Sequence, residues 1–249
     1  MLAIVIMAAG KGKRMESEIP KVLHLLAGRP FIDYVLDAAS VLSAITTVVV
    51  IGHKREQVQD HLEGRGVQFA VQDPPLGTGH AVLQAEPLLA GFVGGIVVLS
   101  GDVPLIQRKT LARLVETHQQ SRNAATVLTT IAENPTGYGR IVRDEAGVFK
   151  GIVEEREASA AIRQVTEVNS GVYVFDSAQL FDYLKQVRPD NRKGEYYLTD
   201  LIEIMIKAGR HVEAHSLAAF WEVRGINTKQ ELRDAEREYQ AMTQGAKNY

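Results

Sequence analysis

The sequence predicts an α/β fold: a mostly parallel, Rossmann-like sheet with helices on both faces. Three observations support this prediction. Short β-branched runs alternate with longer amphipathic stretches. The early runs are apolar throughout, as expected for strands that helices cover on both sides. The length of 249 residues, with 45% hydrophobic and 23% charged residues, is typical of a soluble globular chain with a substantial core.

The first half of the chain contains four apolar runs separated by four helical patterns. We expect strands at Leu2–Met7, Thr46–Ile51, Val67–Val71 and Ile96–Leu99. We expect helices at Phe31–Leu42, Lys54–Leu62, Gly79–Leu89 and Thr110–Gln119. Right-handed crossovers place such strands in parallel.

After about residue 124, turn signals at 134–137 and 144–147 separate shorter strands and predict a β-rich insertion on the same sheet. The expected elements are strands Arg140–Arg143, Val148–Val153, Gly171–Phe175 and His211–Ser216, and helices Ser177–Gln186, Thr199–Ala208 and Thr228–Met242. We expect one domain over 1–227 and a helical arm over 228–249. The apolar side of the arm, with Leu232 and Ala235, either packs back on the chain or pairs with a copy in a homo-oligomer.

Composition excludes several classes of function. The chain has 28 Lys plus Arg and 30 Asp plus Glu, and this net charge of -2 argues against a nucleic-acid partner. The absence of cysteine excludes disulfides and Cys-ligated metal centres, and fits a cytoplasmic location. No apolar run approaches the roughly 18 residues of a membrane helix.

A glycine-containing, cationic turn follows the first strand. It contains Gly10, Lys11, Gly12, Lys13 and Arg14. Glycines let the backbone approach a phosphate and the cations supply countercharge, so the turn predicts a polyphosphate cradle. The spacing matches neither the dinucleotide fingerprint nor a P-loop. The alternative is a solvated basic turn.

Motifs along most of the chain resemble those of the sugar-1-phosphate nucleotidyltransferases. The opening string is Gly10-x-Gly12-x-Arg14-Met15 followed by Pro20-Lys21. Further strings follow in order at 76–81, 101–105, 134–140, 169–171 and 194–200. Within the family, the set is most similar to the uridyltransferase half of bacterial bifunctional enzymes that act on N-acetylglucosamine 1-phosphate. This resemblance implies a nucleotide-diphospho-sugar transferase fold, in which the β-rich insertion binds the sugar.

The resemblance also implies a reaction. The sugar 1-phosphate attacks the α-phosphorus of UTP, which gives UDP-N-acetylglucosamine, a peptidoglycan precursor, and pyrophosphate. A phosphate nucleophile is already ionised near neutral pH, so the reaction needs positioning and charge neutralisation instead of a general base. Two alternatives stay open: another sugar-1-phosphate nucleotidyltransferase, such as one using glucose 1-phosphate, or a catalytically silent sugar-nucleotide-binding protein.

By resemblance, Arg14, Lys21 and Asp102 are the catalytic residues, and Asp102 and Asn227 hold Mg2+. Both metal ligands are hard oxygen donors of the kind this ion prefers. Taken alone, Asp102 is more typical of a turn or cap residue, and Asn227 of the start of the final helix. Only their combination favours a metal site.

The remaining site residues are also implied by the resemblance. Uracil and ribose are expected to contact Met7, Ala8, Ala9, Gly10, Gln72, Gly77 and Thr78. The substrate-binding set further includes Lys21, Ser100, Gly101, Asp102 and Asn227, and the sugar is expected to contact Gly139, Glu154 and Asn169, with Tyr197 and Thr199 nearby. Gln72 alone does not select the base, because its amide can flip.

Two positions depart from the family pattern. Lys13 stands where Thr or Ser is usual, and Ser100 stands where some members have Tyr. The 249 residues contain no hexapeptide repeats, so we expect no left-handed β-helix acetyltransferase domain in them.

A competing metal hypothesis concerns His211, Glu213 and His215, which project from one face of a predicted strand at spacing that suits zinc. We favour an exposed strand face.

Overall fold

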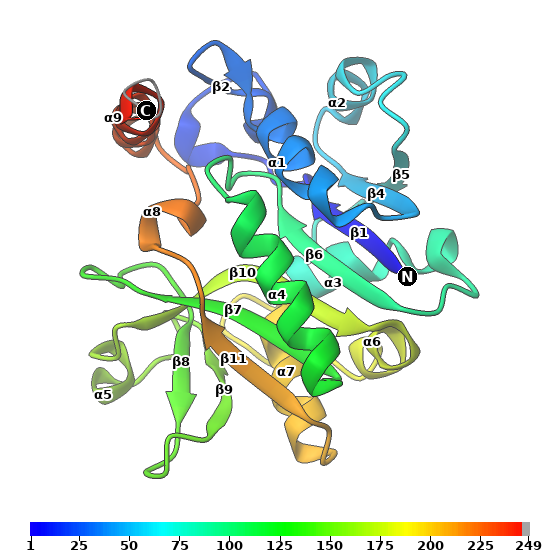
Figure 1. Cartoon of the computed structure of the whole chain (residues 1–249), viewed down its shortest axis with the longest axis vertical. Coiled ribbons are helices and arrows are strands. Elements are labelled where there is room, and N and C mark those ends of the chain that lie inside the picture. The colour runs from blue at the N-terminus through cyan, green and yellow to red at the C-terminus, as the bar shows by residue number, and fades with distance from the viewer. Residues whose placement is uncertain (246–249) are drawn as a thin grey trace.

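A nine-stranded mixed sheet organises residues 1–245, the part of the chain that the computed structural model describes (Figure 1). Its main path runs β11–β7–β10–β6–β1–β4–β5. The bounds are β1 Leu2–Met7, β4 Thr46–Ile51, β5 Gln68–Val71, β6 Gly95–Ser100, β7 Ala125–Ile131, β10 Glu167–Asp176 and β11 Val212–Ser216. Along this path only β10 runs antiparallel to its neighbours, β6 and β7. The predicted mostly parallel sheet is confirmed.

Alternate side chains of the central strands feed two hydrophobic cores. In β1, Ala3 and Val5 pack with helices α3, α6 and α7, whereas Ile4 and Ile6 pack with α1, α2 and α4 on the other face. These helices span α1 Phe31–Ala39, α2 Arg55–His61, α3 Thr78–Leu83, α4 Arg108–Ser121, α6 Ser177–Leu184 and α7 Leu198–Lys207. The uniformly apolar strands therefore correspond to a sheet that is buried on both faces.

The β-rich insertion consists of β8 (Arg140–Arg143) and β9 (Phe149–Val153), followed by the short helix α5 (Ala160–Arg163). Strand β8 pairs antiparallel with both β9 and β10, so the insertion is joined to the main sheet through β10. It lies at the opposite end of the molecule from α2 and β5 (Figure 1).

The C-terminal helix α9 (Lys229–Gly245) packs back on the chain beside β2 (Figure 1). Its Ala235, together with Leu232 and Tyr239, contributes to a third apolar cluster that includes Leu26 and Phe31. Of the two expectations for the arm, packing back is confirmed, and a contact with a second copy stays a prediction. Residues 246–249 of the predicted arm lie outside the described residues.

The remaining elements are short. They are strands β2 (Leu25–Leu26) and β3 (Arg29–Pro30), helix α8 (Phe220–Val223) and the 3-10 helices Lys13–Met15, Lys21–Leu23, Ser40–Leu42 and Glu86–Leu89. The helix predicted at Gly79–Leu89 is divided into α3 and the 3-10 helix Glu86–Leu89. The helix predicted at Phe31–Leu42 consists of α1 followed by the 3-10 helix Ser40–Leu42. Within the described residues, no helix combines the length and hydropathy needed to cross a membrane.

Candidate active site

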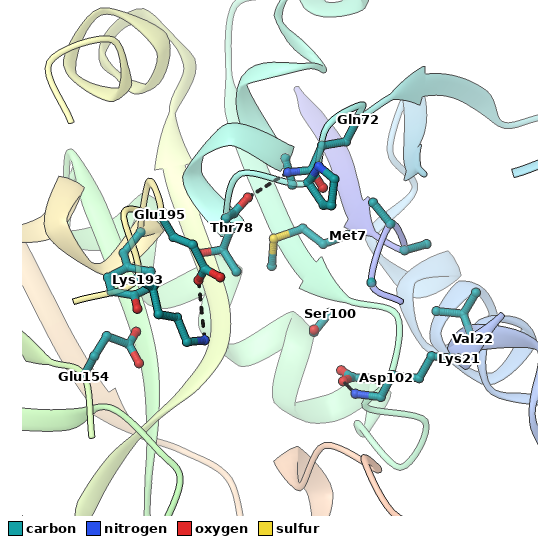
Figure 2. A pocket seen from close by; sticks show the side chains of 17 residues that line it. Met7, Lys21, Val22, Gln72, Thr78, Ser100, Asp102, Glu154, Lys193 and Glu195 are labelled. Atoms are coloured by element: carbon teal, nitrogen blue, oxygen red, sulfur yellow. Dashed lines mark hydrogen bonds and ion pairs between the residues drawn. The ribbon is translucent and has the colours of Figure 1, made fainter. Parts of the chain in front are cut away.

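A cavity of about 400 Å³ opens at the carboxyl ends of β1 and β6, the edge at which parallel sheets bind ligands (Figure 2). Predicted site residues that line it are Met7, Ala8, Ala9, Gly10, Lys21, Gln72, Gly77, Thr78, Ser100, Asp102, Glu154 and Tyr197. Residues that the sequence did not single out also line it: Val22, Pro75, Ala81, Lys193 and Glu195. In Figure 2, Lys21 and Asp102 lie at one end, Glu154 and Lys193 at the other, and Met7 and Ser100 between.

At the cationic end, two oxygen acceptors converge on one ammonium group. The Nζ of Lys21 donates to the Asp102 carboxylate and, at 2.7 Å, to Oδ1 of Asn227. The Nη2 of Arg14 donates to the same Oδ1 at 2.8 Å. The side chains of Lys21 and Asp102 are only 11% and 19% exposed. The three residues predicted to be catalytic are thus joined to Asn227 in one network, although Arg14 and Asn227 do not line the cavity.

The donors at this end fit a hard divalent cation. Asp102 and Asn227 direct a carboxylate and an amide oxygen at a single positive charge, the ammonium of Lys21. Gly225 lies beside both groups, since a Cβ there would be 3.6 Å from Oδ2 of Asp102 and 3.5 Å from Nδ2 of Asn227. Burial alone would raise the pKa of Asp102, but Lys21 and a hydrogen bond from Ser100 outweigh it and lower that pKa below its ordinary value.

A capping arrangement at the start of α9 holds Asn227. The amide of Glu231 donates to Oγ1 of Thr228 at 3.1 Å, and the Glu231 carboxylate accepts from the amide of Asn227 at 2.6 Å. This is a variant of the Thr-x-x-Glu pattern of a helix N-terminus, in which the Glu231 carboxylate binds the amide of the residue before Thr228 instead of that of Thr228. The helix-start and metal-ligand interpretations of Asn227 are therefore compatible.

The glycine turn after β1 combines exposed and tightly packed positions. Gly10 borders the cavity, whereas a Cβ at Gly12, which has a φ of +58°, would lie 3.0 Å from Cβ of Lys21. Gly101 also acts through packing: its amide donates to the carbonyl of Met7 at 3.0 Å, and a Cβ there would lie 2.9 Å from Val22. Glycine at these positions lets the Lys21 and Asp102 segments approach β1 closely.

At a third side of the cavity, hydrogen bonds orient the Gln72 amide. Its Nε2 donates to the carbonyl of Gly77 at 2.8 Å and lies 3.2 Å from Nδ1 of His80. Both contacts engage the nitrogen, so the carboxamide oxygen remains as the acceptor. The sequence left the amide free to flip, and in this structure it adopts the orientation that the Gly77 carbonyl requires, because a carbonyl accepts only from the nitrogen.

The three predicted sugar contacts form one row across three strands. Arg140, the first residue of β8, pairs with Val153 of β9 and with Val168 of β10, which directly precede Glu154 and Asn169. Gly139 therefore lies between these two side chains, and a Cβ on it would lie 3.8 Å from Oε1 of Glu154 and 3.6 Å from Cβ of Asn169. Residues 15 positions apart in the chain thus become neighbours through strand pairing.

Polar partners surround this row. Thr199 Oγ1 donates to Oε1 of Glu154 at 2.9 Å. Burial raises the pKa of Glu154, an effect that the Thr199 hydrogen bond and the charge of Lys193 oppose but do not cancel. Burial is also the first cause that raises the pKa of Tyr197 to about 12, so its phenol stays a donor at neutral pH. Lys193 itself lies 3.5 Å from the carboxylate of Glu195.

Asn169, Thr199 and Gly139 stand behind the lining of the cavity. The Nδ2 of Asn169 donates to the Tyr173 hydroxyl at 2.7 Å.

The placement of the Lys13 side chain lies outside what the structure describes.

The alternative zinc set lies on β11, the edge strand at the far end of the main path from β5. There His215 and His211 flank Glu213, with Nε2–carboxylate distances of 3.0 and 3.7 Å. Within residues 1–245, no group of three or more His, Cys, Asp or Glu side chains is arranged to hold a metal ion. The two imidazoles pair with the carboxylate, as on an exposed strand face.

Comparison with known proteins gives a match over nearly the whole chain. A family model described as nucleotidyl transferase matches residues 3–241. The chain belongs to the nucleotidyl transferase family. The matched region contains every residue that lines the cavity, so the nucleotidyl transferase match and the candidate site coincide. The family predicted from the sequence motifs is confirmed.

Curated relatives within this nucleotidyl transferase group are named bifunctional protein GlmU. The protein from Pelotomaculum thermopropionicum is 48% identical over 236 residues, which cover 95% of this chain and 51% of the relative. The proteins from Streptococcus suis and Enterococcus faecalis are 47% and 45% identical over 93% of this chain and 50% of their own length. The chain spans about half the length of the curated relatives it matches.

Proposed function

We propose that the chain transfers a uridylyl group from UTP to N-acetylglucosamine 1-phosphate, which gives UDP-N-acetylglucosamine and pyrophosphate. The observation that carries this proposal is one cavity with a cation-binding end, a base acceptor and a polar row for a sugar. Family membership supports the reaction class, and the motif resemblance supports the choice of sugar and base. We assign catalysis to residues 1–227 and a supporting role to the arm at 228–249.

The chemistry requires charge neutralisation on the triphosphate. The Lys21 ammonium and the Arg14 guanidinium meet at Asn227, within reach of the glycine turn after β1. Lys21 acts as a compact point charge and Arg14 as a planar fork, so together they hold phosphate oxygens in a fixed orientation. Asp102 and Asn227 would hold Mg2+, which neutralises further charge on the triphosphate when it is bound. The sugar phosphate is already ionised, so no side chain has to deprotonate it.

The base and the sugar meet opposite walls of the cavity. The carboxamide oxygen of Gln72 can accept from the N3–H of uracil, but also from the N4 amino group of cytosine, so Gln72 alone does not select the base. Selection then falls to fixed backbone groups, where an unmatched buried donor costs roughly 1–3 kcal/mol, about tenfold to a hundredfold in selectivity. At the other wall, the Glu154 carboxylate accepts from sugar hydroxyls, and the absence of a side chain at Gly139 lets Ile152, Asn169 and Glu154 pack closely beside it.

The test is pyrophosphate release by the full chain with Mg2+. UTP, CTP, dTTP and GTP are each combined with N-acetylglucosamine 1-phosphate, glucose 1-phosphate and mannose 1-phosphate. We expect selective turnover of UTP with the N-acetyl sugar and loss of turnover in EDTA. Preference for glucose 1-phosphate would correct the substrate, and ligand binding without pyrophosphate release would indicate a non-catalytic protein. Because UTP is an intracellular nucleotide, the proposal includes a cytoplasmic location.

Site variants test the assignment of residues. Asp102→Ala should abolish turnover while the chain still folds, with a lower thermal transition because the Lys21 ammonium loses its carboxylate partner. The matched control is Asp182→Ala, which removes an exposed carboxylate on α6. Full activity of the Asp102 variant would remove this residue from the metal site.

A further inference from the structure

Behind the sugar end of the cavity, one arginine is buried almost completely. Arg140 is 1% exposed at the start of β8. A buried guanidinium is costly unless it is paired and hydrogen-bonded. Its Nη2 forms an ion pair with Oε2 of Glu155 at 2.6 Å, Nη1 donates to the carbonyl of Tyr138, and Nη2 also reaches the carbonyl of Arg163 at 3.4 Å. The contact with Glu155 is an ion pair without hydrogen-bond geometry, and Nε of Arg140 has no hydrogen-bond partner within the described residues.

The partners of this guanidinium flank two of the proposed sugar contacts. Tyr138 directly precedes Gly139, and Glu155 directly follows Glu154. The Arg140 side chain therefore contacts Tyr138, next to Gly139 on the β8 side, and Glu155, next to Glu154 on the β9 side. Because successive side chains of a strand point to opposite faces, a residue next to the sugar row can brace it from behind without entering it.

We propose that Arg140 is a positioning residue of the sugar site, which fixes Gly139 relative to Glu154 by binding the Tyr138 carbonyl and the Glu155 carboxylate. This inference rests on the proposed function. Thr199 engages only one oxygen of the Glu154 carboxylate, and the ion pair beside Glu154 supplies further alignment without occupying that carboxylate. A buried ion pair adds little net stability compared with apolar packing, which favours a geometric role.

The same strand offers a matched control. Arg143 bonds to Glu167 through Nε and Nη2, each at 2.8 Å. This is also an arginine–carboxylate pair, and its side chains are 32% and 16% exposed. It contacts neither neighbour of Gly139 nor the segment at Glu154.

The experiment uses the full chain with Arg140→Lys, Glu155→Gln, Arg143→Lys and Glu167→Gln. KM is measured separately for the sugar phosphate and for UTP, together with calorimetric titration of UDP-N-acetylglucosamine and UTP. We expect the first two variants to raise KM for the sugar phosphate on the order of tenfold and to change KM for UTP less than about twofold, since displaced site geometry weakens only the ligand that it contacts. The control variants should leave both values unchanged.

Parallel changes in both KM values, or no change in either, would overturn the inference. If Arg140→Lys does not fold, Glu155→Gln decides, because it keeps the size of the side chain and removes only its charge. The proposed function is judged separately, on the wild-type chain. If wild type prefers another sugar phosphate, the substrate is wrong, and the KM comparison is made with the preferred sugar.

Discussion

Replacing Lys21 with Met should make the chain bind a divalent cation more tightly. In the structure, the Lys21 ammonium lies where the oxygens of Asp102 and Asn227 meet, so an incoming metal ion has to displace it. Two unit charges about 4 Å apart interact by about 4 kcal/mol at an effective dielectric constant of about 20. The displaced ammonium regains hydration, which offsets part of this energy. We therefore expect a net gain of about 1.5–3 kcal/mol, which corresponds to roughly 10- to 100-fold in affinity.

The assay is titration with Mn2+ as a paramagnetic probe, without nucleotide, together with thermal unfolding in EDTA and in excess metal. The Lys21→Met variant should melt below wild type in EDTA, because the Asp102 carboxylate loses its countercharge. It should also gain more than wild type from added metal. Lys193→Met, at the other end of the cavity, is the control. Equal or weaker Mn2+ binding by Lys21→Met would refute the reasoning.

Three further predictions concern backbone, charge and capping. Gly77→Ala should destabilise the chain by about 3 kcal/mol or more in urea unfolding, because Gly77 has a φ of +114° and a Cβ there would lie 2.5 Å from the carbonyl oxygen of Tyr196. Burial and neighbouring carboxylates raise the pKa of Asp200 to about 6. Its charged form is therefore disfavoured in the folded state, so stability falls as pH rises from about 4 to 6. Asp200→Asn should match wild type at pH 4 and exceed it by about 1–3 kcal/mol at pH 8, and equal stability at both pH values would contradict the cause. Glu231→Ala removes the acceptor for the Asn227 amide and should lower stability by about 1 kcal/mol and Mn2+ affinity by about tenfold, measured by urea unfolding and metal titration.

Much of the nucleotide half of the fold was predictable, because strands buried on both faces leave uninterrupted apolar runs. Strand β7 was not predicted. Its sequence carries Thr126, Thr129 and Thr130, which interrupt the apolar pattern, yet all three are buried. Each hydroxyl has a partner from elsewhere in the chain, including His118 at 2.9 Å and Glu167 at 2.7 Å. Such tertiary partners make a buried polar strand stable, and a local pattern does not contain them.

The candidate site was predicted mainly through motif resemblance, since the residues alone favoured a turn for Asp102 and a helix start for Asn227. Lys193 and Glu195 were not identified as site residues, although Glu195 lies within the motif at 194–200 and Lys193 directly precedes it. Their approach to the cavity depends on how the loop before α7 folds across it. Arg140 was visible as the last residue of the motif at 134–140 and the first of a predicted strand, but its role was not, because that role depends on the register of β8 with two other strands.

Strand β10 divides the molecule into two compartments with different tasks. It is the one strand that pairs with β6 of the nucleotide half as well as with β7 and β8 of the other half. Its pairing with β7 shifts register between Asn169 and Tyr173, so the end that carries the sugar contact follows a different alignment from the end that joins β6. Under the proposed function, variation on the insertion side would reshape the proposed sugar contacts while Lys21, Asp102 and Asn227 keep their positions. Substitutions confined to one side of a single strand would then change the sugar without changing the transfer chemistry.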